Sequence, residues 1–398
     1  MKKEYKIGII THYYKSQNYG GNLQAYALCK ALEGLHVGDV EQICYDVRQG
    51  GAVGNKRKVS LRFLISIPLK FCKRMIGKVR HVQIARRDAK YAPQFKQRET
   101  AFLRFNEDAI KHSQAVYHRD NIALAEKEYD VFITGSDQVW NPRAVHPAYL
   151  LNFVHEKPKL SYAASIACDV LTVEQQQMFR ESLTDYLGIS VREEMAKILL
   201  KHLTNQEVEC VLDPTLLLSR EDWAEMARSV DVPEKYVFCY FLGEDTTSRN
   251  IASQYAQNHG LTLVTLPFMT GHFRKCDEDF GDVRLFDVCP RQFVFLIQHA
   301  SMVFSDSFHA AVFANIFEKE YFVFPRGKGD SMGSRIHQLN ALFGAEGRFC
   351  DTEDKKSLVY IESIREADKP ADRVLLENTK KKSFEFLTST LRKARDYE

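Results

Sequence analysis

Short apolar runs alternate with helix-length amphipathic segments along most of this chain, and this alternation limits the folds open to it. The runs are rich in β-branched and aromatic residues, and the segments between them repeat apolar residues at helical spacing. Such alternation is typical of βαβ units, in which helices cover both faces of a parallel sheet. Because 398 residues exceed the size of a single core, the pattern predicts an α/β fold of two Rossmann-like, doubly wound domains that face a cleft.

The expected elements form two sets. The first has strands at 6–10, 43–47, 131–134, 160–164, 188–192 and 208–213, with helices at 22–35, 173–187 and 193–203. The second has strands at 236–242, 261–266, 302–305 and 321–325, with helices at 248–258, 290–299, 308–316 and 334–343. We therefore expect an N-terminal domain over 1–215, with a basic helical insert at about 48–125, and a C-terminal domain over 216–371. A final charged helix within 372–398 is expected to pack across the outside or to return to the first domain.

Composition narrows the class of protein. With 45% apolar and 27% charged residues the chain is typical of soluble globular proteins, and a net charge of +3 does not indicate a nucleic-acid partner. No run approaches the ~18 to 20 apolar residues of a membrane-spanning helix, and the N-terminus has no signal-peptide pattern. The nine cysteines form no Cys-x-x-Cys pair, and no Asp/His cluster has metal-ligand spacing. We expect a cytoplasmic protein without a metal.

The segment 47–87 breaks the alternation, because it contains many Lys and Arg residues and no Asp or Glu. Its basic part, 56–87, interleaves apolar residues at near-helical spacing. One reading is an amphipathic helix that contacts the inner face of a membrane, where each basic residue contributes about 1 kcal/mol. The other is a solvated helical insert over the first sheet. Pro68 would start or kink any helix in this segment.

Polar residues follow the expected strand 131–134 directly, where open α/β sheets bind ligands. They are a hydroxyl, a carboxylate, two amides and an indole: Ser136, Asp137, Gln138, Asn141 and Trp140. Such polar groups pair with sugar hydroxyls, and an aromatic face covers the apolar side of a sugar ring. The alternative is a strand-to-loop turn anchored by Trp140.

Two further strand ends carry candidate residues. The loop before the first helix contains Asn18, Gly20, Gly21 and Asn22, where glycines permit close ligand approach and free helix N–H groups favour an anion. A tight turn without a ligand would use the same residues. Arg192 ends another strand, where a guanidinium can hold a carboxylate or phosphate in a fork. It could equally form a structural bridge to Glu193, Glu194 or Asp213.

His309 follows the expected strand 302–305, with Asp306 three residues before it. A neighbouring carboxylate can orient an imidazole and raise its pKa toward the working range of a general acid or base. A lone histidine is more often structural, so the sequence pattern by itself leaves both roles open.

Six segments, in order, closely resemble the motifs of the polysaccharide pyruvyltransferase family. They are 18–25 (NYGGNLQA), 135–141 (GSDQVWN), 190–193 (SVRE), 211–215 (VLDPT), 306–310 (DSFHA) and 334–336 (SRI). The resemblance covers roughly residues 5–345. It implies an architecture like that of GT-B glycosyltransferases, and formation of a pyruvate ketal on a hexose of a surface or capsular polysaccharide precursor. The donor substrate would be phosphoenolpyruvate, without a cofactor, and the acceptor could be lipid-linked.

The resemblance also implies roles for these residues. His309 with Asp137 would be catalytic, Arg192 would bind the donor, and the groups of the two loops at 18–22 and 136–141 would bind the acceptor. Many family members carry an arginine two residues before the histidine, but here Ser307 stands there and cannot neutralise a phosphate. Arg326 and Arg335, just downstream, could restore that charge at the donor site.

Two other functions stay open from the sequence. A GT-B-type glycosyltransferase that uses a nucleotide sugar would share the expected fold, because fold alone does not fix function. A catalytically silent glycan-binding scaffold is favoured only if Ser307 reflects a lost donor site.

Overall fold

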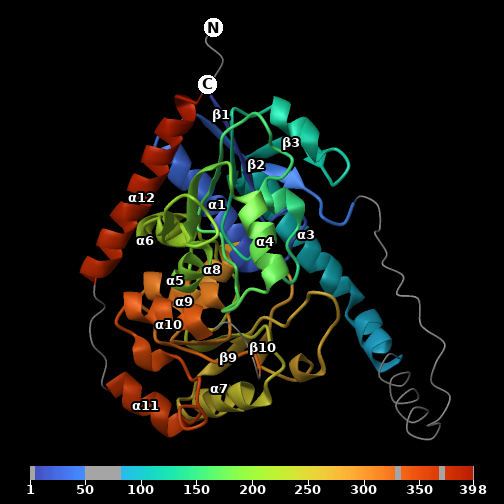
Figure 1. The fold of residues 1–398 in the computed structure, drawn as a ribbon. Coiled ribbons are helices and arrows are strands. Elements are labelled where there is room, and N and C mark those ends of the chain that lie inside the picture. Colours follow the sequence, from blue (N-terminus) through green and yellow to red (C-terminus); the bar gives the residue numbers. More distant parts are fainter. Residues whose placement is uncertain (1–4, 50–81, 328–332, 367–372, 398) are drawn as a thin grey trace, which may run out of the picture.

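The computed structural model describes residues 5–49, 82–327, 333–366 and 373–397 (Figure 1). Most of the basic segment 56–87, for which the sequence left open a membrane contact or a solvated insert, therefore lies outside the described residues. Within them, no helix has the length and apolar character needed to cross a membrane.

The N-terminal domain is built on a seven-stranded sheet in the order β3-β2-β1-β4-β5-β6-β7. All neighbouring strands are parallel, as the right-handed βαβ connection requires. The strands are β1 Lys6–Ile10, β2 Asp39–Tyr45, β3 His112–Tyr117, β4 Val131–Thr134, β5 Lys159–Ser161, β6 Tyr186–Val191 and β7 Val208–Cys210. The helices are α1 Tyr19–Gly34, α3 Ala92–Ala109, α4 Val173–Ser182 and α5 Glu194–Leu200, with short 3-10 turns η1 Ile122–Lys127, η2 Pro147–Leu150 and η3 Pro214–Leu216.

The C-terminal domain has a smaller parallel sheet in the order β10-β9-β8-β11-β12. Its strands are β8 Tyr236–Tyr240, β9 Thr262–Thr265, β10 Val283–Arg284, β11 Met302–Ser305 and β12 Tyr321–Val323. Its helices are α6 Arg220–Met226, α7 Thr246–Asn258, α8 Pro290–His299, α9 Phe308–Ile316, α10 Gly333–Leu342 and α11 Leu358–Glu366, with turns η4 Lys275–Asp277 and η5 Glu346–Arg348. In both sheets the strand order reverses beside the first strand, which is where open α/β sheets bind ligands. The predicted architecture of two Rossmann-like domains is confirmed.

Several expected elements have different bounds. The helix expected over 173–187 ends at Ser182, because the chain enters β6 at Tyr186. The segment expected to be a helical insert at 48–125 includes β3, which pairs with β2 at the edge of the first sheet. That prediction was wrong for β3, because an edge strand with mostly exposed side chains has no apolar run to reveal it.

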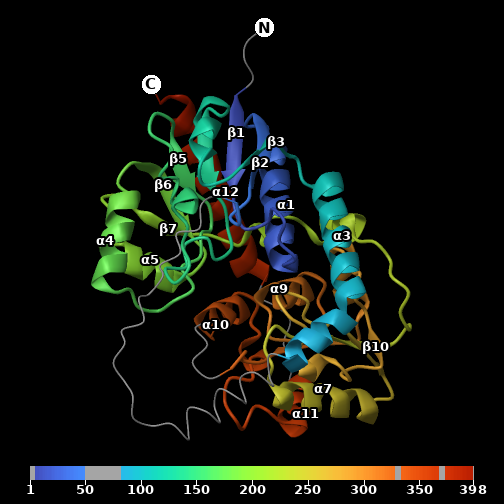
Figure 2. The ribbon, with the colours of Figure 1, turned by 90° about the vertical axis from the view of Figure 1, so that its right-hand side faces the viewer.

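Helix α3 runs along both domains (Figure 2). Near its N-terminal end, Tyr91 stacks on Phe273 of the C-terminal domain, with ring centroids 3.7 Å apart. Further along, Phe102 packs on Tyr19 of α1 at 4.9 Å. Arg87, the last residue of the basic segment, donates from Nε to Oε2 of Glu278 at 3.1 Å. The described end of that segment therefore contacts the C-terminal domain.

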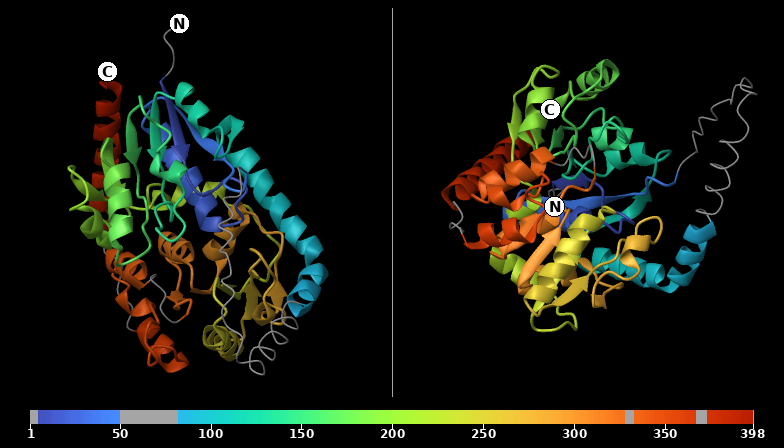
Figure 3. Two further views of the ribbon diagram at one scale, coloured as in Figure 1. Left: turned by 45° about the vertical axis from the view of Figure 1, so that its right-hand side comes forward. Right: turned by 90° about the horizontal axis from the view of Figure 1, so that it is seen from below.

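The last helix, α12 (Arg373–Arg395), packs against the N-terminal domain, opposite α3 (Figure 3). Ser383, Leu387 and Leu391 recur every four residues, which places them on one buried face of the helix. Ser383 Oγ accepts a hydrogen bond from Leu212 N at 3.0 Å. Gly188 of β6 permits the close approach, because a Cβ there would stand 2.5 Å from Thr390 Cγ2.

The two domains share one apolar core. Tyr19, the first residue of α1, stacks on Phe293 of α8 with ring centroids 4.4 Å apart. Its hydroxyl donates to Val288 O at 2.8 Å. This contact fixes the start of α1 against the C-terminal domain, and it positions the loop before α1 at the seam between the two sheets.

Candidate functional site

The start of α1 lies directly against His309. Asn18 caps the helix, since its side chain accepts a hydrogen bond from Gly21 N at 3.2 Å. A Cβ on Gly20 would stand 2.0 Å from His309 Nδ1, so only glycine allows this contact. Asn22 is fully buried and donates from Nδ2 to Ser16 O and Asn18 O. Its amide nitrogen therefore holds the loop in shape, whereas its Oδ1 has no hydrogen-bond partner among the described residues, and a role in acceptor binding stays a prediction.

The polar run after β4 separates into different environments. Asp137 adopts a left-handed backbone with φ 70°, and its side chain is partly exposed. Gln138 and Asn141 are also partly exposed and bond to each other, from Nδ2 to Oε1 at 3.1 Å. Ser136 is buried and donates to Asp213 Oδ2 at 3.2 Å. Gln138 and Asn141 thus remain accessible to a ligand, whereas Ser136 acts through Asp213.

Trp140 is a core residue. Its side chain has no exposed surface, and it packs edge-on against Phe179 and Tyr186. The indole Nε1 donates to Tyr149 O at 3.0 Å. The expectation that its ring covers a sugar was wrong, because an indole in a strand-to-loop turn can bury its face and satisfy its single donor on the backbone.

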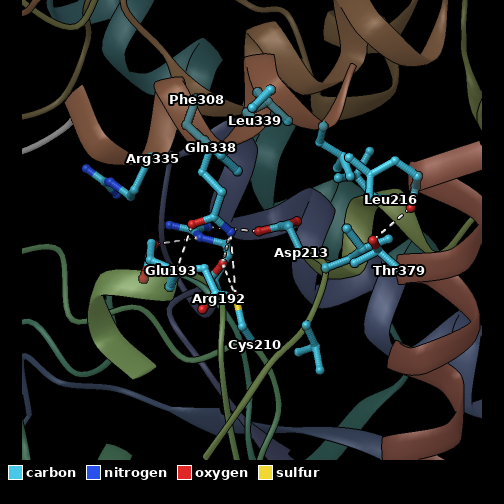
Figure 4. Close-up of a pocket in the computed structure, with 16 residues that line it drawn as sticks. Arg192, Glu193, Cys210, Asp213, Leu216, Phe308, Arg335, Gln338, Leu339 and Thr379 are labelled. Atoms are coloured by element: carbon cyan, nitrogen blue, oxygen red, sulfur yellow. Dashed lines mark hydrogen bonds and ion pairs between the residues drawn. The ribbon is translucent and has the colours of Figure 1, made fainter. Parts of the chain in front are cut away.

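Arg192 is enclosed by acidic side chains (Figure 4). Its Nε donates to Glu193 Oε1 at 3.0 Å, and its Nη1 donates to Asp213 Oδ2 at 2.8 Å. The guanidinium also lies over the Phe308 ring at 4.4 Å. Although burial opposes its charge, the two carboxylates raise the pKa of Arg192 above its ordinary value. Two of the five N–H groups are thus engaged, and the bridge to Glu193 and Asp213 that the sequence left open is present.

Asp213 organises the site, a role that the sequence did not reveal. Its Oδ2 is shared by Arg192, by Ser136 and by His309, whose Nε2 lies 3.5 Å away. Its Oδ1 accepts from the backbone and hydroxyl of Thr215. Burial alone would raise the pKa of Asp213, but His309, Arg192 and Thr215 hold it well below its usual range. Asp213 is therefore a carboxylate at neutral pH.

The partner of His309 is this carboxylate and not Asp306. Asp306 accepts from Leu242 N and Gly243 N, both at 2.6 Å, and burial raises its pKa despite the nearby Arg326. It thus holds the loop after β8. Asp213 lies 96 positions before His309 in the chain, so no local pattern could pair them. The family motif at 211–215 was the available signal in the sequence for Asp213, and it assigned the residue no role.

Arg335 and Arg326 bring further positive charge to the same region. Arg335 on α10 is 4% exposed, and its Nε has no hydrogen-bond partner among the described residues. Burial, and then the charges of Arg192 and Arg326, lower the pKa of Arg335 to about 10. Arg326 donates from Nε to Asp306 O at 3.1 Å. Arg335 is therefore a buried cation whose charge is poorly compensated, as in a site that receives an anion.

Ser307 begins α9. Its side chain accepts from Ala310 N at 3.5 Å, which makes it the N-cap of that helix. Although burial opposes the ionisation of Asp137, the nearby His309, Arg192 and His12 lower its pKa. The site thus brings together His309, Asp137, Arg192, Arg335 and Arg326.

A cavity of about 290 Å³ opens beside Arg192 (Figure 4). Polar groups at one side include Arg192, Arg335 and Gln338, and the rest of its wall is largely apolar, with Leu216, Leu339 and Leu375. Gln338 Nε2 donates to Arg192 O at 3.0 Å and ties α10 to the end of β6. In the described ranges, no cluster of three or more His, Cys, Asp or Glu residues is placed to hold a metal ion.

Comparison with known proteins supplies the family. Two UDP-GlcNAc 2-epimerases are similar in structure. The Neisseria meningitidis enzyme, bound to UDP-GlcNAc, has a TM-score of 0.51 at 12% identity, over 98% of this chain and 100% of that chain. The Rickettsia bellii enzyme has a TM-score of 0.55 at 10% identity, over 98% of each chain. At such identities the likeness shows the fold alone, a GT-B-like arrangement.

No match was found among curated proteins. The family model for polysaccharide pyruvyl transferase matches residues 18–327, which include Asn18 and helix α1, the loop after β4, Arg192, Asp213 and His309. The chain therefore belongs to the polysaccharide pyruvyl transferase family.

Proposed function

We propose that this protein transfers the pyruvyl group of phosphoenolpyruvate to two hydroxyls of a hexose and forms a pyruvate ketal. The hexose would belong to a precursor of a surface or capsular polysaccharide. One observation carries the proposal beyond family membership: Arg335 is a buried cation without a partner at Nε, in the wall of the cavity that Arg192 and Asp213 also line. A site that keeps an uncompensated cation ready favours an anionic donor.

The donor carries a carboxylate and a phosphate. Three arginines, Arg335, Arg326 and Arg192, would bind these two anionic groups. Arg335 is the strongest candidate for the phosphate, because its guanidinium is the least compensated of the three. Arg326 stands beside the N-terminus of α9, where Ser307 replaces the arginine found in many relatives. Arg192 can offer only the N–H groups that Glu193 and Asp213 leave open.

The chemistry follows from proton transfers among these residues. His309, held by Asp213, gives a proton to C3 of the enol, and the C2=C3 electron pair forms the new C–H bond. C2 then accepts a hexose oxygen as that hydroxyl loses its proton. The C2–O bond to phosphate breaks, phosphate leaves with the electron pair, and the second hydroxyl adds to C2 and loses its proton. Phosphoenolpyruvate and the diol thus give the ketal and inorganic phosphate. General acid–base catalysis of this kind raises the reaction rate by about 10²–10⁴-fold.

Phosphate release tests the proposal directly. The protein should release inorganic phosphate from phosphoenolpyruvate in the presence of free or lipid-linked hexose acceptors, and His309→Ala should lower this rate by about 10²-fold or more without loss of folding. Phosphoenolpyruvate, but not UDP-sugars, should raise the melting temperature. Stabilisation by UDP-sugars alone would support the glycosyltransferase alternative. Glycan binding without turnover of any pyruvyl donor would support the silent scaffold.

A further inference from the structure

A second cavity, of about 460 Å³, lies on the β1–α1 side of the seam between the domains. The N-terminal domain lines it with the loop after β1 and with Tyr149, and the C-terminal domain lines it with Phe268 and Arg326. Its volume falls in the range of small-ligand sites, about 300–1,000 Å³. Of the residues expected to bind the acceptor, Asn18 lines this cavity, whereas those of the polar run after β4 do not.

This cavity adjoins the proposed donor site. Arg326 lines the cavity and donates to Asp306 O, three residues before His309. The start of α1 approaches both the loop after β1 and Asp137. A Cβ on Gly21 would stand 2.5 Å from His12 O and 3.4 Å from Asp137 Oδ2. A ligand in the cavity would therefore lie beside Arg326, one of the three arginines assigned to the donor.

The lining suits a sugar ring. Tyr14 and Phe268 are partly exposed aromatic side chains, and both lie in the wall. The Arg274 guanidinium stands 3.6 Å from the centroid of the Phe268 ring and holds that ring in place. Amide and hydroxyl groups from Ser16, Gln17 and Asn18 also line the wall, together with the charged side chains of Lys15, Asp46 and Arg48. Aromatic faces combined with such hydrogen-bonding groups match the apolar and hydroxyl sides of a hexose.

His12 is a titratable side chain of this wall that lies close enough to Asp137 to feel its charge. Its ring meets Tyr149 edge-on, with centroids 4.4 Å apart. Burial lowers the pKa of His12, although the nearby Asp137 acts in the opposite direction. The imidazole is therefore neutral at pH 7 and has a free electron pair for a proton.

We propose that this cavity binds the acceptor hexose and that His12 accepts the proton of the attacking hydroxyl. The inference rests on the proposed function. As the sugar oxygen bonds to C2 of the donor, its O–H bond breaks and the proton passes to the imidazole of His12, while the proton added at C3 comes from His309. His309 would thus supply the proton at C3, His12 would take the proton of the first hydroxyl, and the proton of the second hydroxyl would return to His309.

The binding experiment uses methyl glycosides of glucose, galactose and mannose as probes, with saturation-transfer NMR on the full chain. At least one glycoside should bind, and Phe268→Ala should weaken it by about tenfold or more while phosphoenolpyruvate affinity is unchanged. The bound glycoside should also shift the imidazole resonances of His12. The matched control is His146→Gln, because His146 contacts Tyr149 as well, with centroids 6.3 Å apart, and has no role in the proposed site.

The kinetic experiment compares His12→Gln with the control. His12→Gln should keep glycoside and donor binding but lower turnover by about 10²-fold or more, and His146→Gln should keep both. Melting temperatures check that each variant folds. Glycoside binding that is lost in Gln138→Ala but kept in Phe268→Ala would overturn the inference, as would a wild-type protein that binds none of the probes. If the bound glycoside did not shift the His12 resonances, His12 would not be the proton acceptor. The glycoside experiment needs no donor. Its outcome therefore tests the acceptor site separately from the phosphate-release assay, which tests the proposed function.

Discussion

At the scale of single residues, Asp213 decides how the site is charged. It meets Arg192, Ser136 and His309, which come from three separate parts of the chain. If this carboxylate were absent, Arg192 would turn its charge toward Glu193 alone, and His309 would lose the group that orients it. A histidine that must give up a proton at a defined position depends on such an orienting partner.

Asp213→Asn should therefore affect both stability and turnover. Loss of the buried charge should cost roughly 3 kcal/mol of unfolding free energy, because one partner of a buried ion pair is removed. Since the folded pKa of Asp213 is lowered, its stabilisation is complete above the ordinary aspartate pKa and is lost only as pH falls through the folded pKa. The deficit should thus be constant between about pH 5 and 8 in urea denaturation. Ser136→Ala is the control and should cost about 1 kcal/mol. A deficit that disappears at neutral pH would contradict the assignment.

For Arg335, in contrast to Asp213, we expect that substitution does not lower stability. Arg335→Met removes a buried cation without a partner at Nε, so the melting temperature without ligand should not fall. The same change should raise the KM for phosphoenolpyruvate by about 10- to 100-fold, as expected for a lost hydrogen bond to a charged group. The rise in melting temperature caused by phosphoenolpyruvate should largely vanish.

Arg348→Met is the comparison for Arg335→Met. Arg348 is similarly buried but pairs with Glu320 at 3.1 Å, so its removal should lower stability and leave donor KM unchanged. If Arg335→Met destabilised the protein as much as Arg348→Met and left donor KM flat, Arg335 would be a structural residue.

At the scale of elements, the sequence predicts the buried strands well. It does not predict which residues far apart in the chain contact one another. The strands β1, β4 and β11 have the expected bounds, because each is a short apolar run buried on both faces. Edge strand β3 was missed because it mixes polar and apolar residues and half of its side chains are exposed. Trp140 was assigned to a ligand because the sequence shows which groups are present but not which way they point. The pairing of Asp213 with His309 depends on tertiary contacts between domains.

The contact between β6 and α12 gives a prediction at this scale. Gly188→Ala should cost about 1–3 kcal/mol, because its Cβ would stand 2.5 Å from Thr390 Cγ2 and a packed helix must shift. Adding Thr390→Ser removes that methyl group and should recover part of the loss in a thermal or urea denaturation. Gly34→Ala is the control, since a Cβ there has open space around it, and the change should be neutral or stabilising. Equal losses at both glycines would mean that the helix contact is not the cause.

At the scale of the whole molecule, one aromatic cluster joins the domains. Tyr19 of the N-terminal domain contacts Phe293 and Tyr240 of the C-terminal domain, at 4.4 and 5.4 Å between centroids. The groups proposed for catalysis lie on both sides of the same seam, with Asp137 on one domain, together with Asp213, and His309 on the other. The alignment of these groups therefore depends on how firmly the domains are held together.

Phe293→Ala should loosen that seam. Loss of the fully buried ring should lower the free energy of unfolding by about 3–5 kcal/mol. Calorimetry should then show two unfolding transitions where the wild type shows one. Turnover should fall even below the first transition, because His309 is no longer held against Gly20. Phe179→Ala, buried within the N-terminal domain alone, should instead lower stability without splitting the transition. A single transition in both variants would show that the domains unfold together for another reason.

The return of α12 to the N-terminal domain has a consequence for biosynthesis. A ribosome releases its chain from the N-terminus onward, and domains usually fold in that order. Here the strands of the second sheet, within 236–323, all precede α12, whose Ser383 and Leu387 complete the first domain. The second sheet is therefore fully available for folding while β6 still lacks the helix that covers it. On the ribosome, the domain that is second in the chain is the first that can be finished.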